Sequence, residues 1–274
     1  MVVNFEPLIS HLPVWLLVLF RLSGIFLFAP VFGSLFIPAR VKVFLALGLS
    51  FCVYPMLLTP GTAAAANLVP AIELGLSFWS LVGVVGAELG IGLVIGYGAT
   101  LPLLGMQWGG RAIAQQMGLG LAEVLSPDQE QSGILGQLFY LLALVVFLNL
   151  NGHHVLLRIL VDSFSTIPLG GFRIDGHVID LIVGLMTTML HLAIRVAAPL
   201  VCLIFLETLA TGFIARTVPQ MNILSIGFSV RILLGVTLLI AAISVQSDVA
   251  AQFMYQMFLA PLKAFFEMPA GLPI

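Results

Sequence analysis

Four long stretches of the chain carry no Asp, Glu, Lys or Arg side chain: residues 22–39, 43–72, 89–110 and 131–157. Roughly 20 apolar residues are enough for a helix to cross the hydrocarbon core of a bilayer. Only 8% of the residues are charged and 61% are hydrophobic, whereas a soluble domain carries about 25% charged residues. So few charges cannot cover the surface of a water-soluble protein. The sequence therefore predicts a polytopic integral membrane protein.

The continuous apolar pattern predicts an all-α fold. Lipid-exposed backbone must satisfy its own hydrogen bonds, so only helices and closed barrels span a bilayer. Barrel strands alternate apolar and polar residues, and these segments do not. Turn signals give about six long hydrophobic helices, arranged as hairpins, of the length that a membrane span needs. They are expected near residues 12–29, 41–58, 72–101, 132–150, 178–215 and 222–246, with a further helical tail at 249–266.

Two further expectations concern chain organisation. No polar linker divides the sequence, so residues 1–274 are expected to form a single domain, with a central loop at about 107–131. Pro199 lies inside the segment 178–215, which is longer than a bilayer is thick, so we expect a kink or break there, or a helix that extends beyond the membrane. No basic residue precedes Arg21, so the first apolar run is expected to remain in the mature protein.

Five charged residues stand inside apolar segments: Arg21, Glu88, Arg195, Glu207 and Arg231. Each costs about 2.5–3.5 kcal/mol on insertion scales, so such charges face a protein interior or a watery path. Because the charges are isolated, the pattern favours ion pairing between helices or subunits. A proton or ion relay, as in a secondary transporter, is the alternative, and a third is that some of these helices do not lie in lipid.

Other function classes find no support. The 10 Lys and Arg residues against 12 Asp and Glu provide no basic surface for nucleic acid. GxSxG, CxxC and HExxH motifs are absent, so we predict no enzyme activity and no catalytic, metal-binding or cofactor-binding residue. Cys52 and Cys202 are expected to be small buried apolar residues. The pair His153 and His154 is expected in a loop at a helix end.

Glycine is concentrated between residues 83 and 120, with GxxxG spacing at Gly86/Gly90, Gly92/Gly96 and Gly105/Gly109. Small residues at this spacing let helix backbones approach closely in an apolar medium. We therefore expect tight helix packing, within the chain or between subunits.

Residues 107–131 are the main polar interruption between two long apolar segments. Irregular backbone at membrane depth must be buried in protein or line an aqueous cavity. Methionine and leucine can fill an apolar gap, and glycine gives backbone freedom. The segment is therefore either a pore constriction or plug, or an ordinary extramembrane loop.

Three motifs resemble the signatures of the flagellar biosynthetic protein family FliR. The first runs from Arg21 to Gly33 and continues from Ile37 to Lys42, and the second is Gln115–Leu119. The third runs from Phe213 through the Pro-Gln-Met-Asn-Ile string at 219–223 to Arg231. These motifs lie in the first, middle and last thirds of the chain, so the resemblance covers nearly its whole length.

The resemblance implies a subunit of the type III export gate at the base of the bacterial flagellum. Members of this family join FliP and FliQ in a cone-like helical pore, with FlhB at its cytoplasmic entrance. Unfolded flagellar proteins pass through that pore. The helices are implied to assemble largely above the plane of the bacterial inner membrane, on the periplasmic side, while keeping contact with membrane lipid.

The resemblance also assigns roles to individual residues. The plug of the closed pore is carried over to Gln115, Gln116, Met117, Gly118, Leu119, Gly120, Leu121 and Ala122. The residues that would make subunit contacts or keep the signature motifs are Arg21, Pro30, Gly33, Pro38, Arg40, Pro219, Gln220, Met221 and Asn222. Residues 219–222 are interpreted either as a helix break that packs against neighbouring subunits or as a simple turn. Arg40, with Pro38, either fixes the first hairpin or meets a neighbour.

Two alternatives to a flagellar gate remain at this point. An injectisome homologue would have the same architecture but carry virulence effectors. A proton-coupled small-molecule transporter belongs to a different class, and it would work as a purified chain without companion subunits.

Overall fold

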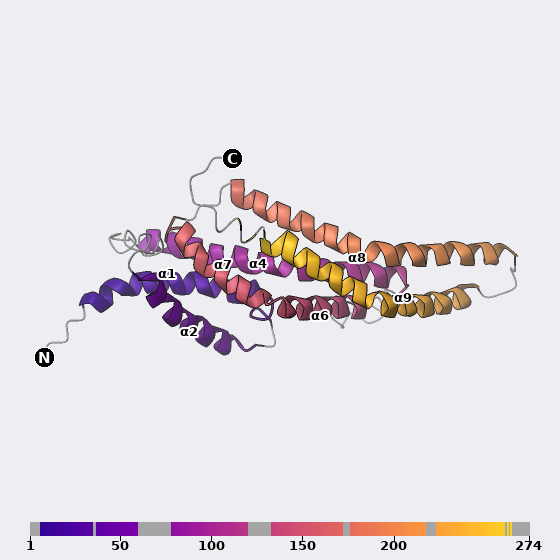
Figure 1. The fold of residues 1–274 in the computed structure, drawn as a ribbon, viewed down its shortest axis with the longest axis horizontal. Helices are drawn as coiled ribbons and strands as arrows, with labels where there is room; N and C mark the ends of the chain where they lie inside the picture. The colour runs from indigo at the N-terminus through magenta and orange to yellow at the C-terminus, as the bar shows by residue number, and fades with distance from the viewer. Residues whose placement is uncertain are drawn as a thin grey trace. The chain divides into compact units, whose positions relative to one another are not determined.

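The structure, a computed structural model, describes residues 6–34, 37–59, 78–119, 133–171, 176–217 and 223–260, together with residues 262 and 264. Every regular element within these residues is a helix (Figure 1), which confirms the all-α prediction. The elements are α1 (Glu6–Phe28), α2 (Ala39–Leu57), α4 (Phe78–Gln116), α6 (Ile134–Asn149), α7 (Gly152–Thr166), α8 (Gly176–Thr217), α9 (Ile223–Phe253) and the π-helical turn η1 (Met254–Leu259).

The helices are long and apolar enough to cross a membrane. Among the described residues, five helices are each long and apolar enough to be a membrane span. The number rises to six if the broken pair α6 and α7 forms one span. Helix α8 has 42 residues and continues through Pro199 without ending. At about 1.5 Å per residue it is about 63 Å long, twice the thickness of the hydrocarbon core. The helix therefore does not end at Pro199, and it is longer than a single span needs; its extension beyond the membrane stays a prediction.

Helix α4 is longer than the sequence predicted, because it continues to Gln116. Residues 107–116, which the sequence assigned to a loop, are therefore helical. The reason is close packing at the glycine pair. A Cβ atom at Gly109 would lie 3.0 Å from the carbonyl oxygen of Ala193, and one at Gly110 would lie 2.8 Å from that of Leu135. The packing against α8 and α6 offsets the roughly 1 kcal/mol that each glycine costs inside a helix.

The chain divides into two compact units. The first contains Met1–Thr100, Asn151–Gly184 and Phe258–Ile274. In this unit α1 packs against α2, and α1 buries Val14, Val18, Leu22 and Ile25. Their spacing of three or four residues places these side chains on one stripe of the helix. That stripe is the core-facing side of α1.

The second unit contains Leu101–Leu150 and Leu185–Met257. Helices α6 and α9 pack together here, and the last part of α4 buries Met106 and Ile113. The outward faces are strongly apolar: Leu233 and Ile240 of α9 are 72% and 71% exposed. A single domain over the whole chain stays a prediction.

Two local predictions are wrong. Cys52 and Cys202 are exposed rather than buried, because a helix that is apolar all round gives no sequence signal for its inner face.

His153 and His154 do not lie in a loop. They are in the first turn of α7, which begins directly after Asn151. Asn151 has φ 54°, a left-handed conformation that asparagine tolerates better than most residues, and this residue separates α6 from α7.

Candidate functional site

A fully buried ion pair joins α1 to α4 in the first unit. The Nε of Arg21 donates to Oε2 of Glu88 at 2.6 Å, and both side chains are 0% exposed. The remaining carboxylate oxygen, Oε1, accepts a hydrogen bond from the backbone N–H of Gly170 at 2.8 Å. Both oxygens of the buried carboxylate are therefore satisfied, as a buried charge requires.

The rest of the Arg21 guanidinium closes the C-terminal end of α7. Nη1 donates to the carbonyl oxygen of Ser163 at 3.1 Å, and Nη1 and Nη2 donate to that of Ile167 at 3.3 and 3.2 Å. The carbonyl groups of a C-terminal helix turn attract a cation. The guanidinium also lies 4.3 Å from the ring centroid of Phe164. Arg21 thus connects α1 to α4 and to the end of α7, and these contacts all lie within this chain.

A second ion pair joins α8 to α9 in the other unit. The Nε of Arg231 donates to Oε2 of Glu207 at 3.3 Å, and its Nη2 donates to the hydroxyl oxygen of Thr208 at 3.2 Å. The hydroxyl of Thr211 donates to Oε1 of Glu207 at 2.7 Å. The two ion pairs confirm the pairing interpretation for four of the five charged residues within apolar segments. The fifth, Arg195, lies over the ring of Phe253 at 5.0 Å.

The GxxxG prediction holds at Gly92, Gly96, Gly105 and Gly109 of α4, which form close helix contacts. It does not hold at Gly86, where an added Cβ atom meets nothing within 4 Å. A Cβ atom at Gly24 of α1 would lie 2.5 Å from the carbonyl oxygen of Leu89, and one at Gly92 would clash with the carbonyl oxygen of Arg21. At Gly96 the nearest atom would be the backbone nitrogen of Ala29 at 3.1 Å. Helices α1 and α4 therefore pack backbone to backbone.

The predicted plug begins at a well-defined helix end. Residues 115–119 of the plug are described, and Gly120, Leu121 and Ala122 lie outside the described residues. The N–H of Leu119 donates to the carbonyl oxygen of Ala114 at 3.0 Å, and that of Gly118 donates to Gln115 at 3.0 Å. Gly118 has φ +81°. This is a Schellman motif with glycine at the left-handed position, so Gly118 stops α4.

Two residues of this helix end contact α9. Met117 is 0% exposed and lies against Gly235, where an added Cβ atom would come within 2.5 Å of the Met117 methyl carbon. Gly118 lies against the ring of Phe228, at 3.3 Å from an added Cβ atom. Gln115, by contrast, is exposed. Within the described part of the plug, Met117 is therefore the apolar residue that packs into a helix surface.

The residues predicted to make subunit contacts have different environments. Pro30 is buried. Gly33 closes the turn after α1, because its N–H donates to Ala29 at 2.7 Å and its carbonyl oxygen accepts from Lys42 Nζ at 3.0 Å. Pro38 precedes the first turn of α2, and both it and Arg40 are exposed.

Pro219, Gln220, Met221 and Asn222 lie outside the described residues, between the end of α8 and the start of α9. Both interpretations of this segment, a subunit contact and a simple turn, therefore stay predictions.

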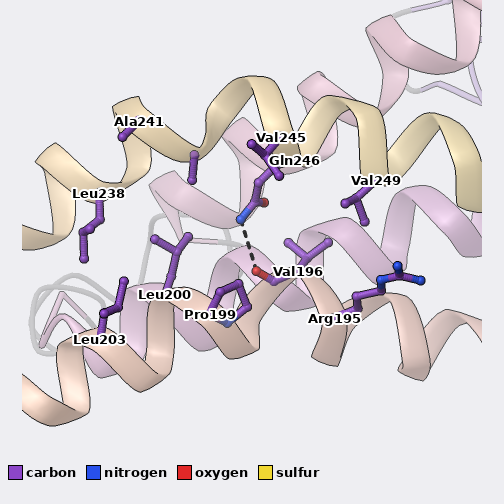
Figure 2. Close-up of a pocket in the computed structure, with 11 residues that line it drawn as sticks. Arg195, Val196, Pro199, Leu200, Leu203, Leu238, Ala241, Val245, Gln246 and Val249 are labelled. Atoms are coloured by element: carbon purple, nitrogen blue, oxygen red, sulfur yellow. Dashed lines mark hydrogen bonds between the residues drawn. The ribbon is translucent and has the colours of Figure 1, made fainter.

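A cavity of about 260 Å³ lies between α8 and α9 (Figure 2). Its lining is almost entirely apolar, from Pro199, Leu200 and Leu203 on α8 to Leu238 on α9. Gln246, which also lines the cavity, is 5% exposed. Its Nε2 donates to the carbonyl oxygen of Val196 at 3.1 Å, the dashed line in the figure. The side-chain amide thus joins α9 to α8 one turn before Pro199. The cavity can hold an apolar group but presents no nucleophile and base pair.

The sequence of this chain matches a known protein family. The family of bacterial export proteins, family 1, matches residues 12–257. The chain belongs to this family of helical membrane proteins.

Three similar proteins are flagellar. The flagellar biosynthetic protein FliR of Bacillus subtilis (strain 168) is 31% identical over 245 residues, which are 88% of this chain and 90% of that protein. FliR of Escherichia coli (strain K12) is 29% identical over 240 residues, 87% of each. FliR of Aquifex aeolicus (strain VF5) is 25% identical over 228 residues, 83% of this chain and 84% of that protein. The resemblance to FliR is confirmed, and the chain is a membrane component of a flagellar export apparatus.

Proposed function

We propose that the chain is a wall subunit of the flagellar export pore in the bacterial inner membrane. It would form this pore with FliP and FliQ, with FlhB at the cytoplasmic entrance. Unfolded flagellar proteins would leave the cytoplasm through it. Family membership supports the export role. The chain's part in this process is physical, to enclose and to close a conduit, and it needs no catalytic residue or cofactor.

The apolar outer faces support assembly with other subunits. Only 6% of the apolar 18-residue window within Gly227–Gln256, and 28% of the one within Val178–Thr217, is buried within this chain. Apolar helix faces of this extent must be covered by lipid or by other helices. The exposed Arg40 and Pro38 at the start of α2 are free to contact a neighbouring subunit. Helix α8 is about twice as long as the hydrocarbon core is thick, which supports a position that reaches beyond the membrane. We infer that the part outside the membrane lies on the periplasmic side.

The observation that carries the gating proposal is the end of α4. An apolar methionine and a left-handed glycine end the helix where residues 115–122 begin to connect two apolar helices. We infer that these residues plug the closed pore. An apolar constriction stops ions because they cannot keep their hydration there. The plug must then move aside when an unfolded chain passes.

Deletion of residues 119–122 tests the gating proposal while it keeps α4 and Gly118. The residue that follows Gly118 still supplies a backbone N–H for the Schellman bond. We expect cells that carry the deletion to keep the assembled export apparatus but to leak small ions, measured as loss of membrane potential or sensitivity to external Na⁺. A matched strain with Gly212→Ala, where an added Cβ atom meets nothing within 4 Å, should not leak. Normal ion retention and normal export of flagellin in the deletion strain would refute the plug role.

A further inference from the structure

Met117, in the described part of the plug, packs on α9 against Gly235, where a larger residue would have to displace it. An added Cβ atom at Gly235 would lie 2.5 Å from Cε, 2.8 Å from Sδ and 2.9 Å from Cγ of Met117. All three distances are below 3.0 Å, a separation that real Cβ atoms essentially never show. Because Cγ is involved as well as the methyl end, rotation of the thioether alone does not relieve the conflict. The Met117 side chain therefore occupies the space that a side chain at 235 would fill.

A second contact on the same helix supports this packing. The ring of Phe228 lies against Gly118, and Phe228 and Gly235 are seven residues, or two helical turns, apart on one face of α9. The Schellman hydrogen bonds fix the backbone at Gly118, and so they fix the direction in which Met117 leaves α4. Met117 is fully buried at this point, whereas the preceding Gln115 is exposed.

We propose that Gly235 is a positioning residue for the plug: together with Phe228 it forms a seat on α9 that holds Met117 and keeps the anchored end of the plug in its closed position. This inference rests on the proposed function of residues 115–122. In this proposal, α9 carries the contact that holds the plug in the closed pore. When the pore opens, the plug must either leave α9 or move together with it.

Oxidation of methionine tests the seat independently of gating. Full-length chain is kept in its export complex and treated with hydrogen peroxide, and the sulfoxide at each methionine is followed by peptide mass spectrometry. Met117 and Met106 are both 0% exposed, and Met56 is 62% exposed. Buried methionines react slowly because the oxidant does not reach the sulfur. In the variant Gly235→Ala, we expect oxidation of Met117 to be about tenfold faster, with Met106 still protected.

Gly212→Ala is the matched control, because an added Cβ atom at Gly212 meets nothing within 4 Å. This variant should oxidise like the original chain at every methionine. If Gly235→Ala leaves Met117 as protected as in the original chain, the seat does not exist and the proposal is overturned.

Ion leakage of the same strains separates the two proposals. Faster oxidation of Met117 together with ion leakage supports both the seat and the plug. Faster oxidation without leakage supports the seat but refutes the plug function. If Met106 also becomes reactive, the Gly235→Ala variant is unfolded. The double variant Gly235→Ala with Met117→Ala then tests whether the steric conflict between these two residues caused the unfolding. The shorter side chain removes the steric conflict, so Met106 must regain its protection, and failure to regain it overturns the proposal.

Discussion

At the scale of single residues, burial and partners decide the role of each charge. Arg21 and Glu88 are separated by 67 positions in the chain yet meet at 2.6 Å. The sequence favoured ion pairing because the charges are isolated in apolar segments. It could not name the partners, because no periodicity relates residues on different helices. The same limit applies to Met117, whose apolar filling character was predictable but whose contact with Gly235 was not.

Loss of Arg21 should destabilise the first unit strongly. Arg21→Ala leaves the Glu88 carboxylate buried without its cation and exposes the end of α7, so we expect a loss of about 3–5 kcal/mol in unfolding free energy. Thermal unfolding of the purified chain in detergent measures this loss. The double variant Arg21→Met with Glu88→Leu should be more stable than Arg21→Ala, because no unpaired charge remains.

Arg40→Ala is the control for this experiment. Arg40 is exposed at the start of α2, so its removal should change the unfolding temperature of the isolated chain little. A chain with Arg21→Ala that unfolds at the same temperature as this control would show that the buried pair does not stabilise the unit.

At the scale of helices, the sequence predicted which segments are helical better than it predicted where each helix ends. Charge-free stretches found the long helices, because a membrane span needs roughly 20 apolar residues. The end of α4 was predicted too early, because the polar stretch that begins at Gln107 and includes Gly109 and Gly110 was interpreted as an interruption between helices. These glycines instead give α8 and α6 room to approach, and Gly118 ends the helix. A helix-ending glycine and a helix-packing glycine look alike in sequence, since tertiary contacts decide between them.

Two glycines of α4 should therefore respond differently to the same substitution. Gly92→Ala places a Cβ atom against the backbone of α1, whereas an added Cβ atom at Gly86 meets nothing within 4 Å. We expect Gly92→Ala to lower stability by about 1–3 kcal/mol. Gly86→Ala should leave stability equal or slightly higher, because alanine favours a helix more than glycine does. Thermal unfolding of the two variants measures the difference, and equal unfolding temperatures would contradict close packing of α1 on α4.

The connection between α8 and α9 supports a further prediction about the companions. If Gln220 and Asn222 pack against neighbouring subunits, replacing both with alanine should reduce recovery of FliP and FliQ in co-purification. The ion pair between Glu207 and Arg231 should keep the two helices joined in the variant. Unchanged recovery of both companions would favour a simple turn at residues 219–222.

At the scale of the whole molecule, the chain leaves much of its apolar surface for others to cover. The membrane-protein class, the all-α fold and the family were all predictable, since they depend on composition and on motifs spread along the chain. The division of the structure into two compact units was not. Each unit collects segments that are far apart in sequence, and the continuous apolar pattern contains no linker that would mark a boundary.

The most direct test of the account is an image of the assembled protein. The full chain, purified together with its companion subunits, is examined by electron cryomicroscopy. The account predicts that this chain forms part of the wall of a central conduit, with residues 115–122 across it and Met117 against Gly235. A self-sufficient monomer with residues 115–122 in solvent, away from any channel, would contradict it.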